Sequence, residues 1–178
     1  HLLLDYGCDN ILLNSSGIKY SPAVAKGLSE CKLQLTVSVD AGCQETYEKI
    51  KLVPTYEKVC DNLRRYAAAQ KEDKDRVCSK FIIVPEYNDS EAEIEGWLEN
   101  THDLGIKHVS IDIDLRWVQK NFDKLKQERR IYDLILYTQH IAERENLVLR
   151  FDERASIMRK IHRVPTAVFG GTMKKIKG

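Results

Sequence analysis

Short apolar runs alternate with longer amphipathic segments along this chain, and the alternation predicts strands and helices in turn. Runs of strand length occupy residues 10–13, 33–39, 81–84, 108–113 and 147–151. Apolar residues at helical spacing predict helices that begin near Pro22, after Gly42, at Tyr56, after Ser90 and near Gln119, the last continuing to about Glu145. Within 108–113 the valine and isoleucines share one face, while Ser110 and Asp112 share the other.

The short connections between these elements restrict the topology. Strands separated by single helices must run parallel, with right-handed crossovers. No G-x-G-x-x-G motif follows the first strand, which disfavours a dinucleotide-binding sheet, whereas polar residues after each strand favour a barrel mouth. We therefore predict an α/β fold: a partial (β/α) TIM-type barrel of about five βα units over residues 1–151. Residues 152–178 are expected to form a less regular, basic C-terminal extension.

Composition excludes several classes of partner. The 178 residues carry a formal net charge of +1, so the overall charge does not favour binding to nucleic acid or to an anionic membrane. No apolar run approaches the roughly 20 residues that cross a bilayer, and these residues show no signal-peptide pattern, so we expect a cytoplasmic protein. The chain opens on His1 rather than Met and enters what looks like the end of a helix, so we expect it to be cut from something longer.

The five cysteines do not form a metal-binding motif. They stand at positions 8, 31, 43, 60 and 78, with no C-x-x-C pair and no zinc-type spacing. Cys60 and Cys78 are expected to behave as small core residues in a reducing compartment. Cys43 alone lies beside a predicted strand end that carries polar side chains.

That strand end, around Ser38 and Asp40, is the first candidate site. Both side chains follow the apolar strand 33–39, although an aspartate here could equally cap the next helix. Other predicted strands place Asn14, Ser16, Lys80 and Asp112 at the same mouth, with Asn14 and Ser16 also suited to turns. Lys80 has three readings that stay open: contact with a ligand carboxylate, a Schiff-base lysine, or a salt bridge.

Four segments resemble, in order and spacing, the radical S-adenosylmethionine (SAM) enzymes. Residues 11–17 resemble that family's third strand and its T-N-G-like turn. Residues 35–50 resemble the fourth strand and following helix, patterned V-S-x-D-x-x-x-x-x-x-Y-x-x-I. Residues 80–89 and 104–114 resemble the fifth strand and the approach to the sixth. The likeness implies strands three to seven of a radical SAM barrel.

Such enzymes bind SAM at a [4Fe-4S] cluster held by a C-x-x-x-C-x-x-C loop and cleave it to start hydrogen abstraction. By resemblance, Ser38 and Asp40 would lie at the SAM ribose, with Asn14, Ser16, Lys80 and Asp112 as further cofactor-binding residues. The cluster loop is absent from these residues, and Lys51-Leu52 stands where the family often has Arg-Gly. We therefore expect both cofactors in a full-length protein, neither bound firmly here, and a small-molecule or peptide substrate.

Two other functional classes are also compatible with the sequence. One is a (β/α) barrel lyase or aldolase that uses Lys80. The other is a non-catalytic interaction fragment. A barrel that does not close leaves unpaired strand edges, which favour homo-oligomers.

Overall fold

Five short strands lie side by side in the order in which they occur in the chain. The computed structural model describes residues 2–71 and 75–162, and its strands are β1 (Ile11–Ser15), β2 (Leu33–Ser38), β3 (Val77–Ile83), β4 (His108–Ile113) and β5 (Val148–Phe151). All four neighbouring pairs are parallel, in the order β1-β2-β3-β4-β5. Sequential parallel strands joined by helices are the arrangement of a (β/α) barrel, here with five strands. The predicted fold class is confirmed.

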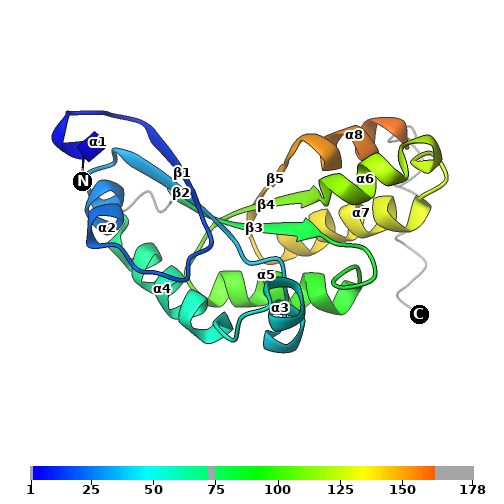
Figure 1. Ribbon diagram of the computed structural model, residues 1–178, viewed down its shortest axis with the longest axis horizontal. Coiled ribbons are helices and arrows are strands. Elements are labelled where there is room, and N and C mark those ends of the chain that lie inside the picture. The colour runs from blue at the N-terminus through cyan, green and yellow to red at the C-terminus, as the bar shows by residue number, and fades with distance from the viewer. Residues whose placement is uncertain (1, 72–74, 163–178) are drawn as a thin grey trace.

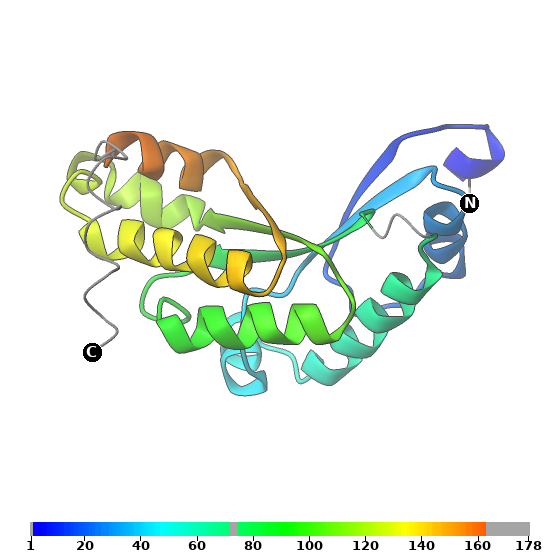
Figure 2. The same ribbon diagram turned by 180° about the vertical axis from the view of Figure 1, so that it is seen from behind.

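Helices connect the strands and form the outer layer. They are α1 (Leu2–Asp5), α2 (Pro22–Ser29), α3 (Gln44–Lys51), α4 (Tyr56–Ala69), α5 (Glu91–Asp103), α6 (Leu115–Lys120), the 3₁₀ turn η1 (Phe122–Lys124), α7 (Arg129–Arg144) and α8 (Glu153–Ile161). Neighbouring helices pack in pairs, α2 on α4 and α5 on α7. Figures 1 and 2 show α2, α4, α5 and α7 following the sheet from one end to the other, with α6 and α8 near the ends of β4 and β5.

Alternation along the strands separates the two faces of the sheet. In β3, Ser79 and Phe81 are buried against the helices, whereas Cys78, Lys80 and Ile82 point the other way and are partly exposed. We call these the helix face and the inner face. Residues in register on parallel strands share a face, which places Ser38, Ser110 and Arg150 with Lys80 on the inner face.

The core lies between the sheet and the helices, and its largest side chain belongs to α5. Phe81 and Trp97 are fully buried, with ring centroids 5.0 Å apart. The one polar atom of the Trp97 ring donates to Ser79 Oγ at 2.8 Å, and Thr101 donates to the same oxygen at 3.2 Å. The buried hydroxyl of Ser79 is thereby satisfied, as burial of a polar group requires.

The predicted helix over 119–145 is wrong in its first part. The structure has α6, η1 and a non-helical stretch before α7 begins at Arg129. Asp114 caps α6, since its carboxylate accepts from the backbone N–H of Trp117 at 2.8 Å. The apolar stripe that supports a long helix starts only at Ile131, and between 121 and 128 Leu125 alone is buried.

The segment after β5 is more regular than the sequence pattern predicts. Helix α8 follows directly and buries Ala155 and Met158, packing against β4, β5 and α7. The remaining basic segment, 163–178, lies outside the described residues. Within 2–71 and 75–162, no helix is long and apolar enough to cross a membrane.

Candidate functional site

The carboxyl ends of the five parallel strands bring the predicted polar residues to one edge of the sheet. This edge is where (β/α) proteins place their chemistry, because the loops after the strands converge there. Among the described residues, Ser38, Asn14 and Ser16 make no side-chain hydrogen bonds there, and the other residues divide into two groups. One holds the end of β2 in place, and the other forms a charged cluster across β3, β4 and β5.

Ser38 lies at the end of β2 on the inner face. It is in register with Lys80 and is partly exposed. Its hydroxyl can both donate and accept, which suits the diol of a sugar. The sequence prediction that Ser38 stands at a strand mouth is therefore matched by its position.

Asp40 has a different environment, because its side chain is directed into the protein. It is 3% exposed, its Oδ1 accepts from the backbone N–H of Ile82 at 2.7 Å, and its Oδ2 pairs with the Lys51 ammonium. Burial raises the pKa of the Asp40 carboxyl above its ordinary value of 3.8, and Lys51 opposes that shift. Both oxygens are thus occupied, and the geometry gives Asp40 a positioning role.

The backbone at Asp40 is held in an unusual conformation. Its φ is +59°, in the left-handed region that non-glycine residues rarely adopt. Asn88, which is completely buried, donates from Nδ2 to the carbonyls of Asp40 at 2.8 Å and Ile82 at 2.9 Å, and accepts from Val84 N–H at 2.6 Å. This amide ties the ends of β2 and β3 together and stabilises the turn that follows Ser38.

Helix α5 supports the same turn from the outside. The Glu93 carboxylate accepts from Gly42 N–H at 2.7 Å and from the Thr46 hydroxyl at 2.7 Å. The Cys43 thiol lies 3.3 Å from the same carboxylate. Ser90 caps the helix as expected, accepting from the backbone N–H of Glu93 at 3.3 Å. The Glu93 side chain, however, binds the β2–α3 turn across the structure.

Lys80 belongs to a cluster of alternating charges. Its Nζ lies 2.6 Å from Asp152 Oδ2 and 3.9 Å from Asp112 Oδ2. The Arg154 guanidinium pairs with the same oxygen, Asp112 Oδ2, and Arg150 Nε lies 3.1 Å from Asp152 Oδ1. A Schiff-base lysine needs a free, neutral amine. The paired Lys80 therefore favours the salt-bridge reading over an aldolase.

Asp112 also caps a helix. Its Oδ1 accepts from the backbone N–H groups of Arg154 at 3.1 Å and Ala155 at 3.3 Å, at the start of α8. A carboxylate in this position is stabilised by the unpaired N–H groups and the positive end of the helix dipole. Asp112 thus has a clear structural task, and its predicted contact with a cofactor remains a prediction.

The two remaining predicted residues lie at the end of β1. Asn14 is exposed on the inner face, in register with Thr36, and Ser16 is exposed just after the strand. The turn itself is satisfied by Ser15, whose Oγ accepts from Gly17 N–H at 3.1 Å. Asn14 and Ser16 therefore remain available at the mouth.

Sequence reasoning missed three members of the charged cluster: Arg150, Asp152 and Arg154. Arg150 lies in β5, and the other two lie where a less regular extension is predicted. One available signal is the alternation Val148, Arg150, Asp152, which places both charges on the inner face. The pairing of Arg154 with Asp112 joins residues 42 positions apart and has no local signal.

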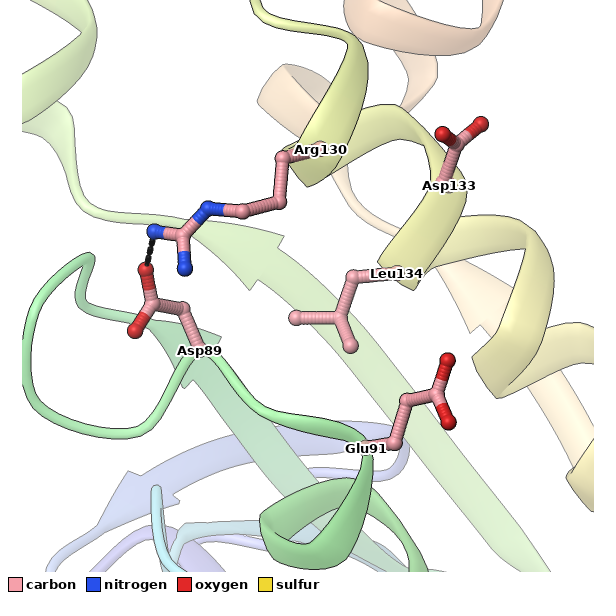
Figure 3. Close-up of a pocket in the computed structure, with 5 residues that line it drawn as sticks. All are labelled: Asp89, Glu91, Arg130, Asp133 and Leu134. Atoms are coloured by element: carbon pink, nitrogen blue, oxygen red, sulfur yellow. Dashed lines mark hydrogen bonds and ion pairs between the residues drawn. The ribbon is translucent and has the colours of Figure 1, made fainter.

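A separate pocket of about 330 Å³ lies in the outer layer and does not belong to this edge. It is lined by Asp89, Glu91, Arg130, Asp133 and Leu134, between the starts of α5 and α7. Figure 3 shows the Arg130 guanidinium directed at the Asp89 carboxylate. Two of the charged groups that line this pocket are therefore already paired with each other, Asp89 with Arg130.

The described residues do not fit an iron–sulfur cluster. Across 2–71 and 75–162, no three His, Cys, Asp or Glu side chains lie close enough together to hold a metal ion. A [4Fe-4S] cluster needs cysteine thiolates around one point. The ligands of such a cluster would therefore have to come from outside these two ranges.

Comparison with known proteins gives a single kind of support. No protein-family model matches the chain, and no curated protein matches it. Among solved structures, a radical SAM methyltransferase from Sphaerobacter thermophilus is similar, with a TM-score of 0.52 and 18% sequence identity. The match covers 83% of this chain and 42% of that one. At this level of identity the likeness shows a shared fold.

Proposed function

We propose that this chain is the part of a radical SAM barrel that binds the nucleoside of SAM. The observation that carries the proposal is the end of β2, where Ser38 presents a hydroxyl on the inner face while Asp40 and Asn88 fix the turn beyond it. Sugar recognition needs short donors and acceptors on a rigid mount. The structural likeness to a radical SAM methyltransferase supports the same assignment.

In this proposal Ser38 binds the ribose, and Asn14 and Ser16 line the neighbouring strand end. Asp40 contributes by holding the backbone, because its carboxylate is committed to Ile82 and Lys51. The cluster that would cleave SAM must be supplied by residues other than those described. The chain alone is therefore expected to bind SAM weakly and to leave it uncleaved.

The proposal is tested by titrating the purified chain with SAM and following ligand signals by saturation-transfer NMR, which detects weak binding. Ser38→Ala should weaken the affinity about three- to tenfold, the loss of one or two neutral hydrogen bonds. Ser29→Ala is the matched control, since the Ser29 hydroxyl donates to the Lys26 carbonyl within its own helix, α2.

Two results would overturn the proposal. One is a wild-type chain that gives no saturation transfer to SAM. The other is a Ser38→Ala variant that binds SAM as well as the Ser29→Ala variant does, because the ribose would then be held elsewhere.

A further inference from the structure

A row of hydrogen-bond donors crosses the inner face beside the proposed nucleoside site. Ser38, Lys80, Ser110 and Arg150 are in register on β2, β3, β4 and β5. Parallel strands are about 4.8 Å apart, so the four side chains form one continuous layer. Two hydroxyls and two cations make a donor set suited to an anion.

The charges around this row do not cancel. The ion-paired cluster joins three cations, Lys80, Arg150 and Arg154, to two carboxylates, Asp112 and Asp152. One positive charge is left over within the cluster. A ligand that carries one negative group would balance it.

Arg150 holds the surplus charge in the most accessible place. Its side chain is 63% exposed, and its pair with Asp152 uses only Nε. In the part of the chain that the structure describes, no hydrogen bond or ion pair uses its two terminal nitrogens. Those nitrogens form the planar fork that binds carboxylate and phosphate in bidentate fashion.

Ser110 supplies an independent observation between Lys80 and Arg150. It has no exposed surface, and its Oγ has no hydrogen-bond partner among the described residues. The neighbouring Cys78 thiol interacts with this hydroxyl, but a thiol is only a weak hydrogen-bonding group. A buried hydroxyl without an oxygen or nitrogen partner is unusual. Because Ser110 has no exposed surface, a ligand atom would reach and satisfy this hydroxyl when the flanking Lys80 and Arg150 side chains turn toward the ligand.

We infer that the Lys80–Ser110–Arg150 row binds an anionic group, a carboxylate or a phosphate, of the substrate. The inference rests on the proposed function, which places the nucleoside at the adjacent Ser38. It assigns the substrate side of the mouth to β3, β4 and β5. An anionic substrate would thus be held next to the nucleoside, on the same face of the sheet.

The test is a titration of the full 178-residue chain with inorganic phosphate and, separately, with acetate, followed through backbone amide NMR shifts at constant ionic strength in chloride. At least one anion should bind and move the signals of Ser110 and Arg150. Arg150→Gln should weaken that binding at least tenfold, and Ser110→Ala about tenfold. Arg144→Gln, which alters an exposed arginine on α7, should leave it unchanged.

The anion that binds more tightly shows whether the site prefers a phosphate or a carboxylate. The inference fails if neither anion binds the wild-type chain, or if Arg150→Gln binds as tightly as Arg144→Gln. Either failure is separate from failure of the nucleoside proposal, because the SAM titration depends on Ser38 and these probes contain no nucleoside.

Discussion

At the scale of single residues, the strand mouth separates side chains that are free from side chains that hold the structure. Ser38 keeps a partly exposed hydroxyl on the inner face, whereas Asp40, two residues on, gives both oxygens to the protein. The V-S-x-D pattern therefore contains one candidate ligand contact and one support. Substitution of each should affect different properties.

Asp40→Asn tests the supporting role through pH. Because burial raises the pKa of Asp40 above 3.8, the unfolded chain releases this proton at lower pH than the folded chain does. Over that interval the folded state binds more protons, so the contribution of Asp40 to stability falls as pH rises. Asparagine does not titrate, and the variant should therefore gain stability relative to wild type as pH rises from about 4.

Urea unfolding of both proteins at several pH values measures this difference. As pH rises, we expect the unfolding free energy of Asp40→Asn to increase steadily relative to that of the wild type, and the difference then to level off. A gap that stays constant across the whole range would mean that Asp40 has the same pKa in the folded and unfolded chains.

Ser38 could be predicted because its signal is local. An apolar strand that ends in a small polar residue fixes both its place and its face. The partners of Asp40 and Asp112 could not be predicted, because neither is a near neighbour in the sequence. Lys51 is the last residue of α3, and Arg154 lies 42 residues after Asp112. Glu93 is predictable in one respect and not in another. Its position three residues after Ser90 is typical of a helix start, but the contact of its carboxylate with Gly42 N–H on another element has no local signal.

At the scale of elements, the turn between β2 and α3 is packed directly on α5. A Cβ added to Gly42 would lie 2.3 Å from the Glu93 carbonyl oxygen, and one added to Gly96 would lie 2.8 Å from the Gly42 carbonyl oxygen. Backbone contacts this close leave no room for a methyl group. The two glycines let α5 approach the end of β2 and support the site.

Gly42→Ala should therefore destabilise the protein by about 3 kcal/mol, the upper part of the usual range for overpacking. Gly105→Ala is the control: no atom lies within 4 Å of its added Cβ, and its φ of +73° alone should cost about 1 kcal/mol. Denaturant midpoints of the two variants report the comparison. Equal losses would contradict a tight turn–helix contact.

The element borders show where pattern reasoning is reliable. Strand β4 matches the predicted 108–113, because valine and isoleucine alternate there with polar residues. The helix predicted over 119–145 is interrupted, because the stretch before Ile131 lacks the apolar stripe that packs a helix against the sheet. Helix α8 follows Asp152, a residue type typical of helix starts, but the Asp152 side chain does not cap the helix, and the capping carboxylate is that of Asp112 in β4.

At the scale of the whole molecule, the sheet has two edges. Within the described residues, β1 pairs only with β2, and β5 pairs only with β4. Leu12 on β1 is 72% exposed, and Val148 on β5 is 54% exposed. Unpaired strands with exposed apolar side chains favour association with other strands.

We accordingly expect the isolated chain to self-associate, and Leu12→Lys to reduce the association by placing a charge on the β1 edge. Sedimentation velocity over a range of concentrations measures the change. Leu115→Lys, at an exposed leucine away from the sheet edges, serves as the control. A wild-type chain that stays monomeric throughout would contradict the expectation.

The central claim is that SAM binds on the inner face of the sheet, at the carboxyl ends of the strands. Amide NMR shift mapping tests this claim most directly. Titration of the labelled chain with SAM should move the signals of Ser38, Asn14 and Ser16 and of the turn after β2. Signals around Asp89 and Arg130, which line the outer-layer pocket, should stay in place. Shifts confined to that outer pocket, or no shifts at all, would contradict the claim.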